Sequence, residues 1–596
     1  MALLPGYREL LPVVSRLGMV ACLLLMQGCR SQASLGDDAG SNQNHNQNSN
    51  QGADAALPDA VSPDALVLAE DPHLLPDLAV TGVELYQAVQ IPLYEDGAAI
   101  GQAARNAPVV AGREAVFRVY AVPADPGSWT SRQVRAELFL GPVGVRPFDP
   151  QDPGAAQSIV VTEARLVSGP SLEADLESTF VLRVPATHVS AMPAMAWAVR
   201  LVDPTETSPA VQAGTANEAR VPADGLTAHP LQAEEDGGGI ELVLVPLRYD
   251  RDGSGRLPDT SPAQLGLIDA MLTNLYPASV TSITVHEPIP WNNSLTWTGN
   301  FDFGDLNEYL VDLRVEENAP ARAHYYGLVC PADTFGAYCG SSCVTGQSYL
   351  VSSPEDGDYR VGGGMGYSGE DSVWTLAHEL GHQFGRSHAP CGVSSYDSSY
   401  PYSGGSIGVF GMDLRQSLAP LLSPEVYTDL MGYCDDTWVS DYTYKAFFLR
   451  LIAVNALPPP PLPAPLLPGP WLQPGALLQP EPGGAATAPI VRYRALRLSP
   501  GERPTWGRSL RSRTARHSGE AHAVIIRDAR GRELLRPEAP MIRHGHGGGA
   551  RLLVPEPFPP GAATLELPRS IATGFGIPHG ASRLALPAEA ARPAPR

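Results

Sequence analysis

One stretch, HELGHQFGRSH at 378–388, constrains the fold more than any other part of the chain. In a helix of about 100° per residue, His378 and His382 lie one turn apart, so both imidazoles can reach a single metal ion. Glu379 is rotated aside from them, beside the place of a metal-bound water, where a general base is needed. Gly385 can adopt a positive φ and end the helix, and His388 can then return as a third ligand. The sequence therefore predicts a zinc site on a helix that ends in a sharp bend.

The residues around the motif predict which face of this helix is buried. Apolar side chains recur on the side opposite the histidines, at Val373, Leu376, Ala377, Leu380 and Phe384. We expect this face to pack on a core. Three neutral imidazoles leave zinc an open position for water, whose pKa falls to about 7 in such sites. The alternatives are a helix with incidental surface histidines and a zinc site that is structural or inactive; the retained glutamate weighs against the second.

The motif resembles the extended zinc-binding signature of the metzincin metalloproteases. The resemblance implies a methionine turn beneath the metal, for which the chain offers Met412 and Met431. We choose Met431, because Met-Gly-Tyr is similar to the turn of astacin-like and serralysin-like members. Tyr433 is then a removable fifth ligand that stabilises the oxyanion, with a packed aromatic side chain as the alternative. The resemblance covers about 240–450 and assigns no subfamily.

Five cysteines follow the N-terminal segment, and an exported chain permits disulfides between them. The sequence HAPC after the third histidine resembles adamalysin-like enzymes, in which a cysteine ties down this loop. A bridge between Cys391 and Cys434 would hold the methionine turn to the histidine loop. Cys330, Cys339 and Cys343 are too close in sequence to assign, and we expect one pair among them.

With 596 residues, the chain is too long for one core and predicts a multidomain protein. Strand-like segments punctuated by Pro and Gly predict an N-terminal β-sandwich. Helices alternating with strands, including a helix capped by Ser261 with Pro262 at its first position, predict an α/β (α+β) metzincin-like catalytic domain. Further strands predict a small C-terminal β domain. The predicted parts are a signal peptide (1–28), a disordered polar tether (29–76), the β-sandwich (77–222), the zinc metalloprotease domain (233–450), a Pro-rich linker (457–489) and the C-terminal β domain (490–596).

The first residues predict export. Arg8 and Arg16 precede a short apolar run ending in QGC, and the region around Cys29 resembles a bacterial lipobox, in which the cysteine receives lipid. A plain secretory peptide is the alternative. We expect a bacterial cell-surface or outer-membrane lipoprotein, otherwise a secreted protein, that is monomeric and meets the membrane only through this anchor.

Charge is distributed unevenly along the chain. The formal net charge of −22 argues against nucleic-acid binding, because phosphate would repel such a chain. From Ile490 onward, however, arginines outnumber acidic residues. This difference predicts that the C-terminal part is a separate basic unit.

Four further segments each allow two interpretations. The glycine-rich YRVGGGMGYSG (359–369) flanks an edge strand that pairs with substrate, or is an ordinary loop. DRDGSGRLPD (250–259) holds Ca²⁺ or forms a polar turn, and we favour the turn. HGH at 544–546 binds a stray metal or lies solvated in a Gly-rich loop, and we favour the loop. The arginine-rich 503–516 contacts anionic lipid or polysaccharide, or forms a solvated basic surface, and we favour the surface.

These features together predict a zinc-dependent endopeptidase that hydrolyses extracellular proteins. His378, His382 and His388 would hold Zn²⁺, and Glu379 would pass a proton from water to the leaving amine. The expected partner is a protein or glycoprotein substrate. Two rival functions are a mucin- or glycoprotein-specific metalloprotease whose β domains grip the substrate, and a surface adhesion lipoprotein with a vestigial zinc domain.

Overall fold

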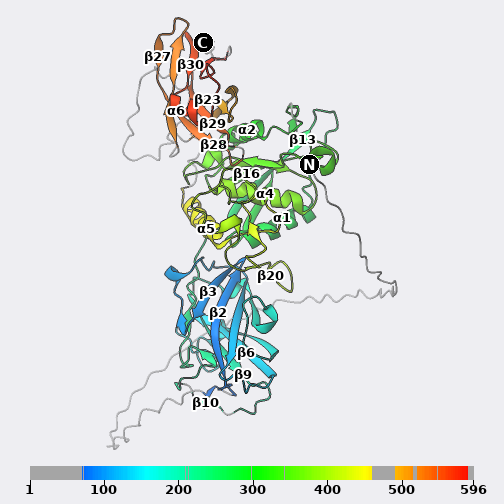
Figure 1. Ribbon diagram of the computed structural model, residues 1–596, viewed down its shortest axis with the longest axis vertical. Helices are drawn as coiled ribbons and strands as arrows, with labels where there is room; N and C mark the ends of the chain where they lie inside the picture. Colours follow the sequence, from blue (N-terminus) through cyan, green and yellow to red (C-terminus); the bar gives the residue numbers. More distant parts are fainter. Residues whose placement is uncertain are drawn as a thin grey trace, which may run out of the picture. The chain divides into compact units, whose positions relative to one another are not determined.

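A computed structural model describes most of the chain from Glu70 onward. Strands predominate over helices and form several separate sheets (Figure 1). The predictions for the signal peptide, for Cys29 and the tether up to residue 69, and for 459–489 of the Pro-rich linker lie outside the described residues. The described residues are 70–71, 73–208, 210–212, 214–296, 299–340, 342–458, 490–513, 520–546 and 548–587.

The N-terminal region consists of two antiparallel sheets that share one apolar core. Its main strands are β2 (Leu78–Gln87), β3 (Val89–Glu95), β4 (Ala98–Ala99), β5 (Ala115–Pro123), β6 (Arg132–Pro142), β7 (Ile159–Val167), β8 (Phe180–Val184), β9 (Met195–Val202), β11 (Arg220–Val221) and β12 (His229–Pro230). One sheet contains β3-β2-β5-β8, with β4 beside β3; the other is β11-β9-β6-β7, with β12 beside β9. Phe117 of β5 and Trp197 of β9 are buried in the common core, as in two sheets packed face to face. A separate short pair joins β1 (Glu70–Asp71) to β10 (Val211–Gln212).

Two short strands from much later in the chain extend the first of these sheets. They are β19 (Gly411–Met412), which pairs with β3, and β20 (Leu421–Leu422), which pairs with β19. Met412 is buried there beside Tyr86 and Val116. Residues expected in the catalytic segment therefore complete a sheet of the N-terminal region.

The central region is a largely parallel sheet flanked by helices. Its strands are β13 (Ile240–Tyr249), β14 (Thr281–Val285), β15 (Ile289–Trp291), β16 (Ala323–Val329), β17 (Gly346–Ser348) and β18 (Val361–Met365), in the order β14-β13-β16-β18-β17 with β15 beside β13. All pair in parallel except β17, which is antiparallel to β18 at the edge. The helices are α1 (Pro262–Leu275), α2 (Phe303–Glu316), α3 (Phe335–Cys339), α4 (Glu370–Gln383) and α5 (Asp441–Asn455), and β21 (Thr428–Asp429) pairs with β22 (Thr437–Trp438) nearby.

The predicted cap of α1 is present, because Ser261 accepts a hydrogen bond from the Gln264 amide and Pro262 is the first helical residue. Among the described helices, none has the length and apolar character that a membrane crossing requires.

The two faces of the central sheet belong to different apolar cores. Leu242 and Leu244 of β13 join a cluster with α1, α4, α5 and the N-terminal sheets. Val245 and Leu247 of the same strand join a second cluster with α2 and strands of the C-terminal region. The sheet is therefore buried on both sides, as a parallel sheet must be.

The glycine-rich segment is not at the edge of this sheet. Residues Val361–Met365 form β18, which lies between β16 and β17, so β17 is the edge strand. Glycine is required here because a side chain would strike neighbouring groups: a Cβ at Gly363 would lie 2.6 Å from Leu306 of α2, and one at Gly364 would lie 2.1 Å from the Tyr326 hydroxyl. These glycines thus allow close packing within the core rather than close approach of a substrate.

The C-terminal region contains two antiparallel sheets with a third apolar core between them. Their strands are β23 (Val491–Leu498), β24 (Thr505–Ser512), β25 (Ala521–Ala523), β26 (Ile525–Asp528), β27 (Glu533–Leu535), β28 (Glu538–Arg543), β29 (Ala550–Glu556), β30 (Ala562–Glu566) and β31 (Arg583–Ala585), and one helix is present, α6 (Arg569–Gly574). The orders are β24-β23-β29-β28-β25 and β27-β26-β30-β31.

The arginine-rich strand β24 packs on helix α2, so the described part of 503–516 is not the solvated basic surface that we expected. The Arg511 amide donates to Asp312 Oδ1 at 2.7 Å, and the Arg508 amide donates to Glu308 Oε2 at 3.1 Å. Arg513 forms a 2.6 Å ion pair with Asp358. The C-terminal region is therefore not independent of the acidic part of the chain, because its arginines face carboxylates of the central region.

Candidate metal centre

Helix α4 carries the histidine motif and ends as the sequence predicts. Glu370 and Asp371 lie in its first turn, where negative charge interacts favourably with the helix dipole. Gly385, just beyond the end, has φ +84°, and a Cβ there would lie 2.7 Å from the Val351 carbonyl oxygen. Glycine is needed at this bend for both reasons.

The bend brings His388 back to the two histidines of the helix. The ring centroids of His378 and His382 are 4.9 Å apart, and the His388 centroid lies 5.4 and 4.8 Å from them. The three predicted ligands are thus brought together in one cluster.

Each ring is oriented for metal binding. The Nδ1 atoms of His378 and His382 donate to the Leu430 and Arg386 carbonyl oxygens, both at 2.7 Å, which leaves Nε2 as the free acceptor. The Nε2 atoms of all three histidines are buried and have no hydrogen-bond partner in the described part of the chain. Burial, with His546 nearby, lowers the pKa of His378 to about 3 and that of His388 to about 4. The rings are neutral near pH 7, which is the form that binds metal.

A fourth histidine, which the sequence analysis did not assign to the site, completes the cluster. One nitrogen from each of His378, His382, His388 and His546 lies within 4.8 Å of the others. His546 belongs to HGH, between β28 and β29, so the expectation of a solvated loop is wrong. The adjacent His544 is buried as well. Two histidines around one glycine were the only sequence signal, and nothing in it specified a contact with a motif more than 150 residues earlier.

Glu379 lies beside the four histidines. The residue is 1% exposed, and its Oε1 is 2.5 Å from His546 Nε2. Its Oε2 is buried without a hydrogen-bond partner among the described residues. The carboxylate therefore faces the cluster with one oxygen available for a proton.

The chain after the third histidine closes the site from another side. Met431 is buried and packs on α4 at Gly381. A Cβ added to this glycine would lie 2.4 Å from the Met431 Sδ. The Tyr433 ring centroid lies 5.6 Å from that of His378 and 4.9 Å from that of His388, and its hydroxyl contacts His546 Nδ1. Both residues chosen from the sequence are therefore next to the histidines, whereas Met412 belongs to β19.

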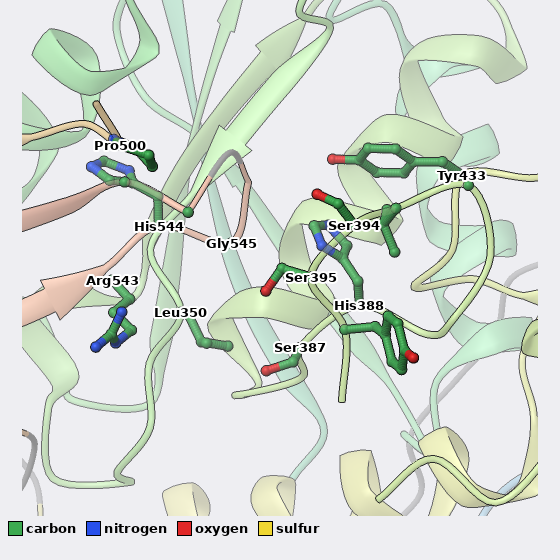
Figure 2. Close-up of a pocket in the computed structure, with 15 residues that line it drawn as sticks. Leu350, Ser387, His388, Ser394, Ser395, Tyr433, Pro500, Arg543, His544 and Gly545 are labelled. Carbon is green, nitrogen blue, oxygen red and sulfur yellow. The ribbon is translucent and has the colours of Figure 1, made fainter. Parts of the chain in front are cut away.

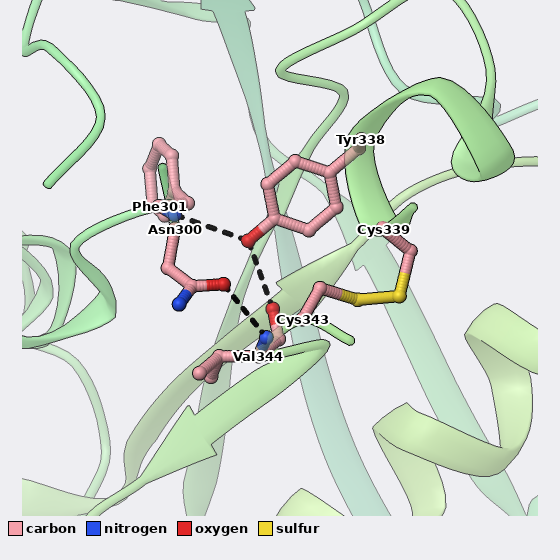
Figure 3. The surroundings of a disulfide bond; sticks show 6 residues. All are labelled: Asn300, Phe301, Tyr338, Cys339, Cys343 and Val344. Atoms are coloured by element: carbon pink, nitrogen blue, oxygen red, sulfur yellow. Dashed lines mark hydrogen bonds between the residues drawn. A yellow bond between two sulfur atoms is a disulfide. The ribbon is translucent and has the colours of Figure 1, made fainter. Parts of the chain in front are cut away.

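The described cysteines form two disulfides. Cys391 is bonded to Cys434, as predicted, and this bond ties the loop after His388 to the chain after Met431. Cys339 is bonded to Cys343, which settles the pair that the sequence left open (Figure 3). Cys330 is buried and unpaired. Burial raises the pKa of the Cys330 thiol to about 11.

The second disulfide lies beside a small hydrogen-bond network. The Tyr338 hydroxyl donates to the Val344 carbonyl oxygen at 2.9 Å and accepts from the Phe301 amide at 3.0 Å (Figure 3). The Val344 amide in turn donates to Asn300 Oδ1 at 3.0 Å. These bonds anchor the chain just before the edge strand β17.

Two cavities adjoin the histidine cluster. One, of about 580 Å³, is lined by residues that include Trp374, His378, Glu379, Leu430, Tyr433 and His546. The other, of about 690 Å³, is lined by residues that include His388, Ser394, Tyr396, Tyr433, His544 and Gly545 (Figure 2). The site is thus accessible to a molecule larger than water on more than one side.

The segment 250–259 is a turn held by ion pairs, as expected. Asp252 pairs with Arg256, and Asp250 Oδ2 lies 3.0 Å from Arg248 Nε. The carboxylates therefore already have cationic partners, which favours the polar-turn interpretation. In the described part of the chain, the histidine cluster is the grouping suited to an ion.

The donor set fits a metal ion. Three buried imidazole nitrogens without partners converge from α4 and the loop after it, and backbone carbonyls fix the second nitrogens of His378 and His382. Such unsatisfied buried acceptors are costly unless an ion or another donor satisfies them. Imidazole suits zinc, copper, iron and nickel alike, so the geometry shows a candidate metal centre rather than a particular metal.

Comparisons with known proteins give no assignment. No family model matches the chain, and no curated protein matches it. A solved structure described as "Structure of a chaperone-substrate complex" is similar at 10% identity over 46% of this chain and 39% of that chain, with a TM-score of 0.19. The match spans less than half of that chain, and a likeness of this size carries no argument about fold or function. The fold and site themselves define a multidomain protein, largely of β-sheets, with a candidate metal centre on an α/β region.

Proposed function

We propose that the protein is a zinc-dependent endopeptidase of the metzincin type that hydrolyses peptide bonds of extracellular proteins. The observation that carries the proposal is the convergence of three unpartnered Nε2 atoms beside one buried carboxylate. The extended motif, the bend at Gly385 and Met431 beneath α4 support the metzincin type.

The five residues predicted from the sequence have the following roles in this reaction. His378, His382 and His388 would hold Zn²⁺. When bound, zinc polarises the scissile carbonyl group and lowers the pKa of water to about 7. Glu379 would accept a proton on the oxygen that now has no partner and deliver it to the leaving amine. The Tyr433 hydroxyl would donate a hydrogen bond to the oxyanion.

The edge strand and the smaller cavity support a peptide as substrate. Strand β17 is the edge of the central sheet, and on its outer side only the last residue, Ser348, accepts a backbone hydrogen bond from the described chain, from Gly545. An extended substrate chain could pair with this outer side. The cavity of about 580 Å³ lies at Glu379 and is lined by Trp374 and Leu430 as well as polar groups. An apolar side chain next to the scissile bond would fit there, with the backbone held by β17.

The proposed location is extracellular. Two disulfides are compatible with an exported protein, since such bonds persist in oxidising compartments. Attachment through a lipid on Cys29, or secretion after removal of 1–28, is part of the proposal. We propose a monomer that acts on a protein or glycoprotein.

The test uses the full chain, purified and reconstituted with zinc. We expect one zinc per chain and cleavage of a denatured protein substrate that a chelator abolishes. Glu379→Ala is expected to retain zinc and to lose about 10³-fold in activity, since general acid–base catalysis contributes about 10²–10⁴-fold. Glu370→Ala, in the first turn of the same helix, is the matched control and should keep its activity. Equal cleavage by the Glu379→Ala chain would contradict the proposal.

A further inference from the structure

The segment Arg543–His546, after strand β28, pairs with the chain at the open side of the central sheet. Tyr349 and His544 form an antiparallel bridge, and the Leu350 amide donates to the Arg543 carbonyl oxygen at 2.9 Å. The Gly545 amide donates to the Ser348 carbonyl oxygen at 3.0 Å. Figure 2 shows Arg543 and His544 following one another toward Gly545, on the same side of the cavity as Leu350. The segment thus extends the sheet at β17 through main-chain hydrogen bonds, as an added peptide strand does.

Gly545 allows this segment to cross directly over the metal-binding rings. A Cβ at this position would lie 2.2 Å from Cδ2 of His382 and 2.4 Å from its Cγ. No other residue can be placed there without moving the segment or the ring. The close approach carries the next residue, His546, into the cluster.

His546 occupies the remaining corner of the cluster. Its ring centroid lies 5.2, 4.9 and 5.1 Å from those of His378, His382 and His388, close to the spacings among those three rings. Its Nε2 contacts Glu379 Oε1 and its Nδ1 contacts the Tyr433 hydroxyl, which are the groups assigned to proton transfer and oxyanion binding. A neutral imidazole has one acceptor nitrogen, so a bound metal would replace one of these two contacts. A catalytic zinc keeps one position open beside three protein ligands, and a closed zinc has four.

We infer that His546 is a fourth ligand of the metal and that the Arg543–His546 segment takes the place of a substrate at the end of β17, where it pairs with residues 348–350, so that the folded chain holds its own site closed. The inference rests on the proposed function, since closure has a consequence only for a site that would otherwise act. It assigns a role to the C-terminal region: its docking on α2 holds the segment in the cleft.

A permanently structural four-histidine centre is the main rival to this inference. In such a centre, removal of His546 would weaken metal binding without opening a coordination position that another ligand can take. Glu379 argues against it, because a buried carboxylate oxygen without a partner, at a cavity of about 580 Å³, serves no structural purpose in the described residues.

The experiment measures access to the metal in the full chain loaded with Co²⁺ instead of zinc. Acetohydroxamate, a small bidentate ligand, is titrated while the visible absorption of cobalt is recorded. We expect His546→Ala to bind acetohydroxamate at least tenfold more tightly than the unsubstituted chain. Gly545→Ala keeps all four histidines but displaces the segment, and it should shift the affinity in the same direction. His579→Ala, an exposed histidine of the same region, is the control and should match the unsubstituted chain.

Cleavage by the zinc-loaded proteins separates this inference from the proposed function. His546→Ala is expected to cleave at least tenfold faster than the unsubstituted chain. Tighter acetohydroxamate binding without cleavage by either variant would support the ligand role of His546 and contradict the endopeptidase proposal. Equal acetohydroxamate affinity in all four chains would overturn the inference, and cleavage by the unsubstituted chain would in that case leave the proposed function standing.

Discussion

The two faces of the central sheet are covered in different ways. On the face of α4, the apolar core continues into the N-terminal sheets without interruption. On the face of α2, a smaller apolar core is bordered by arginines of the C-terminal region that meet carboxylates of the helix. Apolar burial involves no charges that salt can screen, whereas an ion pair needs both partners and is weakened by screening. The comparison indicates that apolar burial dominates the contact with the N-terminal sheets, whereas the contact with the C-terminal region combines a smaller apolar core with ion pairs.

The largest effect is expected at the buried ion pair of the α2 face. Glu308 is fully buried, and its Oε1 lies 2.7 Å from Arg551 Nε. Glu308→Ala would leave the guanidinium buried without this partner, and we expect a loss of about 3–5 kcal/mol. Hydrogen exchange of peptides from α2 and β24 would report the local opening. Unchanged exchange would show that these charges do not hold the C-terminal region.

The next effect concerns the disulfide at the α4 face. Cys391 and Cys434 are 43 residues apart, and closing a loop of this length is worth about 3–4 kcal/mol. Replacing both by Ser should increase hydrogen exchange in the loop after His388 and weaken zinc binding. The control replaces Cys339 and Cys343, whose separation of 4 residues predicts a smaller loss. Equal losses for the two disulfides would contradict the account.

A smaller effect is expected where the N-terminal sheets meet the central region. Trp438 is buried, and its indole Nε1 donates to the Ala88 carbonyl oxygen at 2.9 Å. Trp438→Phe removes this hydrogen bond and part of the ring, and should lower the free energy of unfolding by about 1–2 kcal/mol. Urea unfolding would measure the change. If the loss of unfolding free energy became smaller as salt was added, as for a screened ion pair, the apolar character of this contact would be contradicted.

The smallest effect is expected for an exposed ion pair at the C-terminal contact. Arg511 and Glu316 are 3.2 Å apart, with the Glu316 side chain 70% exposed. Glu316→Ala should cost less than about 1 kcal/mol and nothing measurable in 1 M salt. A cost similar to that of Glu308→Ala, measured by the same hydrogen exchange, would remove the distinction between buried and exposed charges.

Local features of the site were predictable from the sequence, and contacts across the fold were not. The spacing of His378, His382 and His388 predicts their convergence because one helix and one bend determine it. The cap at Ser261 is local in the same way. His546 was missed because its place depends on how a distant pair of strands docks.

The role of the glycine-rich segment was left open for a related reason. Glycines in β18 indicate close packing, but the sequence does not show whether the neighbour is a substrate or Leu306. Likewise, the arginines of β24 indicate positive charge, and their partners on α2 become visible only in the folded chain. A run of glycines or arginines in the sequence indicates a close-packed or a positively charged segment, but it does not indicate which part of the chain packs against that segment.

Zinc content measured per chain tests the central claim most directly. The account predicts one zinc in the purified full chain, and a large loss of bound zinc when His378 and His382 are both replaced by Ala, because both are ligands. Replacement of His522 and His579, histidines of the C-terminal region outside the cluster, should leave the zinc content unchanged. A full chain without bound metal, or equal zinc in the His378→Ala/His382→Ala chain, would contradict the account.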